Sequence, residues 1–214
     1  MHRRTALSVS AALLAAAPLL SACGSGAHPG AAAVVGGERI EVSSLQAQVR
    51  DVRTAQQASP QSAQLIKATG DLSREKLNVM IFDRVVDRVA EDNGITVDRG
   101  EVQKARAEFV EQSGGEDQLA AMLLQQQGVA PDQIDGVVRR TVLMNKIAAK
   151  LGIANTPEGQ QKLTQVFTAA SKALSIDVNP RFGAWDDEKI QLGTFSPAWL
   201  RQISQPPEAA EAGA

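Results

Sequence analysis

The longest helical pattern in the chain covers residues 73–93, where apolar and polar positions separate onto two faces. At about 100° per residue, the charged positions 83, 84, 87, 88 and 91 fall in one stripe, so more than half of the circumference is apolar. The pattern predicts a central helix, capped at its start by Ser73 and packed against several neighbours. Its apolar residues are Leu77, Val79, Met80, Ile81, Phe82, Val85, Val86 and Val89.

Shorter helical patterns lie on both sides of this segment. One begins at Ser43 as N-cap, one at the capping pair Asp98 and Glu101, one at Pro131 and one at Thr156. A further short helix ends near residue 128. Residues 55–70 are rich in Gln, Ser and Ala, and the pattern leaves them open between a loop and a loosely helical segment.

Two short extended segments flank the helices. Residues 33–40 form a hairpin pattern around Gly36 and Gly37, and residues 176–179 form a strand that Pro180 ends. The two segments are natural partners and would join the ends of one domain. We therefore predict a mainly α, multi-helix domain over residues 33–186 with a small β element. An irregular to disordered tail is expected over residues 187–214.

The first 22 residues have the organisation of an export signal. Arg3 and Arg4 precede an apolar stretch that is shorter than the ~20 residues of a membrane-spanning helix. The following LSAC sequence resembles a lipobox, which makes Cys23 the predicted site of lipid attachment and residues 23–32 a flexible spacer. The alternative is a free structural thiol at Cys23, an unfavourable state in an oxidising compartment. Export by the general or the twin-arginine route stays open.

Charge and composition exclude several kinds of chemistry. The formal net charge of −2 becomes −4 when the two leader arginines are removed, which argues against nucleic acid as a partner. The only histidines are His2 and His28, and Cys23 is the only cysteine. A Ser-His or Cys-His nucleophile and a zinc site are therefore excluded from the folded part. No phosphate-binding glycine loop is present, so no cofactor is expected.

Carboxylates are the remaining candidates for catalysis. Asp186, Asp187 and Glu188 could bind calcium or act as an acid–base pair, but their spacing is more typical of a solvated acidic turn. Asp83, Asp87 and Glu91 are expected to form i,i+4 pairs with arginines of their own helix, such as Arg84 and Arg88, on a face exposed to water.

Methionines on apolar helical faces suggest a binding surface that can adapt to different ligands. Thioether side chains repack around varied partners, although such positions are more often core. The candidate peptide-binding residues are Met80, Phe109, Met122, Leu123 and Met144.

Two segments resemble the SurA- and PrsA-type extracytoplasmic chaperones. Residues 34–40 (VVGGERI), followed by a capped helix, are similar to the opening of that family. Residues 178–186 (VNPRFGAWD) are similar to its closing strand. The resemblance covers residues 33–186 and implies a helical chaperone domain that binds unfolded or partly folded exported proteins. With the lipid anchor, the expected location is the extracytoplasmic face of the cell membrane.

Many members of that family carry a parvulin isomerase domain, for which this chain has little room. About six residues separate Leu151 from Pro157, and 29 residues follow Trp185. Isomerase activity is therefore not expected. A dedicated adaptor for one cell-envelope partner and an enzyme that works through carboxylates stay open as alternatives. The client and the oligomeric state are also open.

Overall fold

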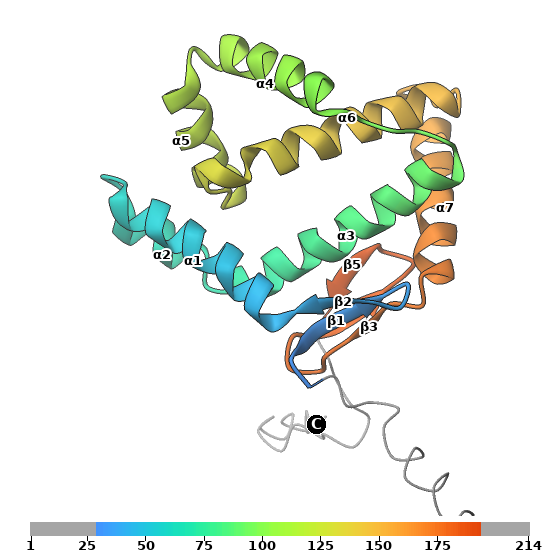
Figure 1. Cartoon of the computed structure of the whole chain (residues 1–214), viewed down its shortest axis with the longest axis horizontal. Coiled ribbons are helices and arrows are strands. Elements are labelled where there is room, and N and C mark those ends of the chain that lie inside the picture. Colours follow the sequence, from blue (N-terminus) through green and yellow to red (C-terminus); the bar gives the residue numbers. More distant parts are fainter. Residues whose placement is uncertain (1–28, 194–214) are drawn as a thin grey trace, which may run out of the picture.

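The computed structural model describes residues 29–193, which form seven α-helices and two small sheets. The three-stranded sheet lies at one end of the molecule, and the α4–α5 hairpin lies at the other (Figure 1). The mainly α prediction is thereby confirmed. The predicted signal peptide, Cys23 and most of the spacer lie outside the described residues. Within the described residues, no helix combines the length and the apolar character needed to cross a bilayer.

The sheet joins the two ends of the domain, as the sequence predicts. Its strands are β1 (Ala31–Val35), β2 (Glu38–Glu41) and β3 (Asp177–Val178), in the antiparallel order β2-β1-β3. Ala33 lies opposite Ile40 on one side and Val178 on the other. The turn between β1 and β2 uses Gly36 at φ 59° and Gly37 at φ 83°, a left-handed region that favours glycine.

The central helix is α3 (Leu72–Asp92), as predicted, but Ser73 does not cap it. The helix starts one residue earlier, after Asp71, and Asp71 makes no side-chain cap. Together with α7 (Pro157–Ala173), the sheet and the end of α6 (Ile134–Lys150), α3 encloses the largest core cluster. We call β1–β3, α3, α7 and the C-terminal hairpin of β4 (Ala184–Asp186) and β5 (Gln191–Gly193) the body.

The N-terminal helices form an arm. Helix α1 (Val42–Ala58) continues directly from β2, so its N-cap is Glu41 and the predicted cap Ser43 lies inside the helix. Residues 55–70, which the sequence left open between a loop and a helix, contain the end of α1 and a second helix, α2 (Ser62–Ala68). A small cluster joins this arm to α3 and α5; its buried residues are Val52, Leu65, Leu72, Leu124 and Ala130.

A helical lobe stands opposite the body. Helix α4 (Arg99–Ser113) starts with the predicted capping box: the Glu101 amide donates to Asp98 Oδ1 at 2.9 Å, and the Asp98 amide donates to Glu101 Oε2 at 3.0 Å. Helix α5 (Glu116–Gln127), the 3₁₀ turn η2 (Pro131–Gln133) and the first half of α6 complete the lobe. Its buried residues are Val102, Leu119, Leu123, Val129, Ile134 and Val138.

Ion pairs tie α3 to α6. Asp83 pairs with Arg140 and Asp87 with Arg139, each at 2.7 Å. The expectation of i,i+4 pairs for these two aspartates was wrong. The face of α3 that carries them lies beside α6 and stays partly exposed, so their arginine partners come from that helix.

The folded region continues beyond residue 186. Strand β4 (Ala184–Asp186) pairs with β5 (Gln191–Gly193), and Trp185 lies opposite Leu192. The Trp185 indole donates to Ser171 Oγ at 2.7 Å, and Ser171 donates to Asp187. The predicted domain end at 186 is therefore too early, because a turn of acidic residues connects two paired strands. Residues 194–214 lie outside the described part.

Candidate functional site

Helix α5 is the shared wall of three openings. The largest, of about 560 Å³, lies between α5, the start of α3 and β5. A second, of about 260 Å³, lies inside the lobe between α4, α5 and α6. A third, of about 280 Å³, separates α5 from the arm. Gln125 borders the first and third openings, and Gln127 borders the first and second, so the three meet along one helix.

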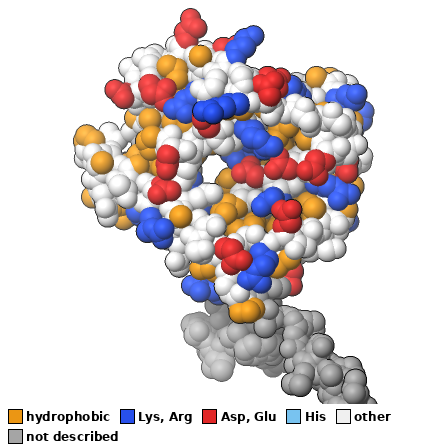
Figure 2. Space-filling view, in the orientation of Figure 1, with side chains coloured by type: hydrophobic (Ala, Val, Ile, Leu, Met, Phe, Trp, Pro, Cys, Tyr) orange, Lys and Arg blue, Asp and Glu red, His pale blue; other side chains and the backbone are white. Residues whose placement is uncertain are grey.

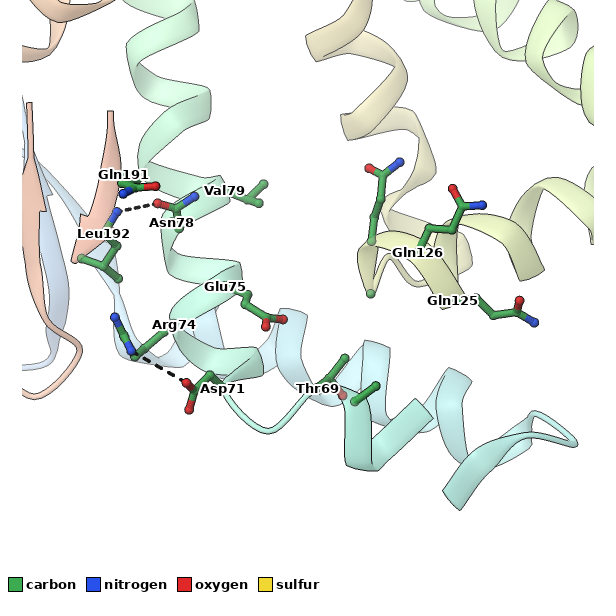
Figure 3. A pocket seen from close by; sticks show the side chains of 13 residues that line it. Thr69, Asp71, Arg74, Glu75, Asn78, Val79, Gln125, Gln126, Gln191 and Leu192 are labelled. Carbon is green, nitrogen blue, oxygen red and sulfur yellow. Dashed lines mark hydrogen bonds and ion pairs between the residues drawn. The ribbon is translucent and has the colours of Figure 1, made fainter. Parts of the chain in front are cut away.

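The largest opening, which we call the amide cavity, is lined by polar side chains from four elements (Figure 3). The space-filling view shows a hollow in this part of the molecule, between α3 and the turn from α5 to α6 (Figure 2). The polar lining residues are Thr69, Asp71, Arg74, Glu75, Asn78, Gln125, Gln126, Gln127 and Gln191. Val79 and Leu192 supply apolar surface. The volume lies in the range of ordinary ligand sites.

A partly buried hydrogen-bond network fixes the wall formed by the turn from α2 to α3. Arg53 donates to the Thr69 carbonyl at 2.7 Å and to the Thr69 hydroxyl at 2.8 Å. Gln56, which is fully buried, accepts from Arg53 and donates to the same hydroxyl at 3.0 Å. Because the network satisfies these polar groups inside the protein, the end of α2 is held in one geometry.

A second wall, formed by α3 and β5, belongs to the body. Asn78 on α3 accepts a hydrogen bond at 2.7 Å from the Leu192 amide of β5. Arg74 donates to the Phe182 carbonyl at 3.1 Å. The C-terminal hairpin thus becomes part of the cavity, with Gln191 and Leu192 at its surface.

A buried lysine connects the lobe to α3. Lys76, only 5% exposed, donates to Gln133 Oε1 at 2.8 Å, and Gln133 donates to the Gln48 carbonyl at 2.9 Å. Burial, together with the positive charge of Arg140, lowers the pKa of Lys76 to about 8. This link holds η2, and with it the start of α6, against the arm and the body.

The second opening, which we call the apolar pocket, contains three of the five predicted peptide-binding residues. Phe109, Met122 and Leu123 line it together with Leu119, Val137 and Val138. Met122 is 37% exposed, so part of its side chain is open to solvent. Met80 and Met144 do not join them, because both pack against the core of the body.

Comparison with protein-family models matches residues 3–148 to a SurA-like N-terminal domain. The chain belongs to this SurA-like family. The matched residues include β1, β2 and α1 to α5, and they end near the end of α6. No isomerase domain is detected in the chain. No curated protein and no solved structure matches the chain.

The acidic turn of this SurA-like domain has structural partners. Asp186 accepts from the amides of Glu188 and Lys189 at 3.0 and 3.1 Å, and Glu188 pairs with Lys172 at 2.6 Å. Hydrogen bonds from Lys189, first from its amide and then from its side chain, lower the pKa of Asp186. Within residues 29–193, no three metal-ligating side chains come together in an arrangement that could hold a metal ion.

The polar residues of the amide cavity were not predicted from the sequence. The run of three glutamines at 125–127 was a visible signal, because it places six amide hydrogen-bonding groups in one turn of helix. Leu192 was assigned to the tail, and its partner Asn78 lies 114 residues away, so no local pattern relates them.

Proposed function

We propose that this SurA-like domain is a lipid-anchored, extracytoplasmic chaperone that binds segments of unfolded exported proteins around α5. The observation that carries the proposal is the shared wall: one helix of a SurA-like domain borders both the amide cavity and the apolar pocket. A client segment that crosses α5 at Gln127 would contact both.

The two openings suit the two parts of an unfolded chain. Glutamine and asparagine side chains carry both donors and acceptors, so they can pair with peptide groups of any sequence. The pocket beneath Met122 can take one apolar side chain, whose burial contributes about 25 cal/mol per Å². Binding that combines main-chain pairing with a single apolar anchor is broad and reversible. This is the behaviour needed to keep an aggregation-prone chain soluble without a chemical step.

Suppression of aggregation tests the proposal. The mature protein is mixed at stoichiometric ratios with several unfolded exported proteins, and light scattering is followed as each is diluted from denaturant. Slower aggregation of most clients is expected. If none is slowed, the chaperone proposal fails. If one envelope protein alone is bound, in a stable complex, the domain is a dedicated adaptor.

Attachment through Cys23 is a separate part of the proposal. Replacement of Cys23 by Ser should move the protein from the membrane fraction to the soluble fraction of the cell envelope. Mass spectrometry of the wild-type N-terminal peptide should detect acyl chains on Cys23. An unmodified Cys23 in membrane-associated protein would refute lipid anchoring and leave client binding untouched.

A proline-isomerisation assay tests the absence of catalysis. The mature protein is expected to leave the rate of cis–trans exchange in a proline peptide unchanged. Clear acceleration by purified protein would show a catalytic function that the proposal lacks.

A further inference from the structure

The ionisable side chains around the amide cavity differ in whether they have an ion-pair partner. Three ionisable residues line it: Asp71, Arg74 and Glu75. In Figure 3, Glu75 points from α3 into the space in front of Gln125 and Gln126, whereas Asp71 lies beside Arg74 at the rim. Glu75 is exposed, and within residues 29–193 it forms no ion pair. A carboxylate therefore faces the open cavity.

The two cationic side chains next to Glu75 in sequence, Arg74 and Lys76, bind other groups. Arg74 donates to the Phe182 carbonyl and lies 3.8 Å from Asp71. Lys76 is buried and donates to Gln133. Glu75 acts on Lys76 only through its charge and forms no ion pair with either cation. Within residues 29–193, the cavity therefore offers a ligand one carboxylate that has no ion-pair partner.

The wall opposite Glu75 is neutral and carries amides. Gln125 is partly engaged, because it donates to Gln61 Oε1 at 2.7 Å. Gln126 and Gln127 are exposed at the cavity surface. A peptide main chain lying between the two walls can form hydrogen bonds with the amides on one side and direct a side chain at Glu75 on the other.

We propose that the amide cavity binds an extended polypeptide segment that carries a lysine or arginine side chain, and that Glu75 determines this preference. The inference rests on the proposed function, since it names the class of client segment. An ion pair with hydrogen bonds is stronger than a neutral contact, but the partial exposure of this site limits its contribution. We expect a preference of about twofold to fivefold for a cationic segment over a neutral one.

Matched peptides test the preference on the mature chain. Two fluorescent peptides of alternating apolar and polar residues differ only at the centre, which is Lys in one and Gln in the other. Their affinities are measured by anisotropy at low and high salt. Wild-type protein is expected to bind the Lys peptide more tightly, and salt should reduce the difference.

Two variants locate the effect. Glu75→Gln should make the affinities for the two peptides equal without weakening binding of the Gln peptide. Glu108→Gln removes an exposed carboxylate from α4, away from the cavity, and should keep the preference. Urea unfolding of each variant checks that the fold is intact.

The possible failures are distinguishable. If wild-type protein binds both peptides equally, the preference is refuted and the chaperone proposal stands. An equal loss of preference in Glu108→Gln and Glu75→Gln would assign it to overall charge and overturn the role of Glu75. If neither peptide binds and aggregation is also unaffected, the proposed function itself fails.

Discussion

The body and the lobe differ in how they use apolar side chains. In the body, α3, α7 and the sheet enclose the largest core cluster, and the central residues of α3 are fully buried. In the lobe, the cluster is smaller and does not include Met122, which stays 37% exposed at the edge of an open pocket. Since a large core can hold the fold alone, the lobe can leave apolar surface free to bind a ligand. The comparison predicts that stability and binding can be separated by mutation.

The largest effect is expected in the body. Ile81→Ala removes a fully buried side chain from the centre of α3 and should lower the free energy of unfolding by about 3–4 kcal/mol. Urea unfolding followed by circular dichroism measures this. Leu119→Ala in the lobe should mainly increase hydrogen exchange in α4 and α5. A loss of protection across the whole protein in Leu119→Ala would contradict the division into body and lobe.

Substitution of the glycine just before β4 should reduce stability nearly as much. Gly183 has φ +130°, and a Cβ there would lie 2.2 Å from the Gly193 carbonyl oxygen. Gly183→Ala should destabilise the protein by about 2–3 kcal/mol, with a change in Trp185 fluorescence. Gly136→Ala on α6 is the control, because nothing lies within 4 Å of its added Cβ. The control should match or exceed wild-type stability.

The buried Lys76 predicts an unusual pH dependence at the junction of body and lobe. Its pKa is about 8 when folded and 10.5 when unfolded, so the unfolded state binds more protons between these values. Stability should therefore rise from pH 8 to about pH 10, by about 2 kcal/mol. Lys76→Met should lack this rise, and Lys104→Met, at an exposed position in the lobe, should keep it. An identical profile in wild type and Lys76→Met would refute the burial of a charge here.

The smallest effect on stability should accompany the clearest effect on binding. Met122→Ser is expected to lower the free energy of unfolding by only about 1 kcal/mol, because more than a third of the residue's surface is already exposed. It should nevertheless weaken suppression of client aggregation several-fold. Ile66→Ser is the matched control, since Ile66 is 36% exposed on α2 and lines none of the three openings around α5. Equal effects of both variants would mean that general surface hydrophobicity, not the pocket, binds clients.

The sequence predicts those elements whose determining residues lie close together along the chain. The capping box at Asp98, the long apolar face of α3 and the glycine turn at residues 36–37 each lie within a few neighbours, and each is confirmed. The partners of Asp83 and Asp87 were missed because they come from α6. The hairpin at β5 was missed because three residues give too short a pattern to count as a strand.

The residues of the candidate site also fall into those that local sequence patterns can predict and those that they cannot. Phe109, Met122 and Leu123 could be proposed from helical periodicity, since neighbouring faces of consecutive helices carry them. The amide cavity could not, because four separate elements bring its walls together. Periodicity also could not separate Met80 and Met144 from Met122, since buried and exposed apolar positions have the same spacing.

Site-specific crosslinking in cells tests the central claim most directly. A photoreactive residue is placed at Met122 in the lobe and, in a second strain, at Ala169, an exposed position on α7 of the body. The account predicts that Met122 captures a broad set of unfolded exported proteins and that Ala169 captures few. Equal capture from both positions, or capture from Ala169 alone, would contradict the assignment of binding to the lobe.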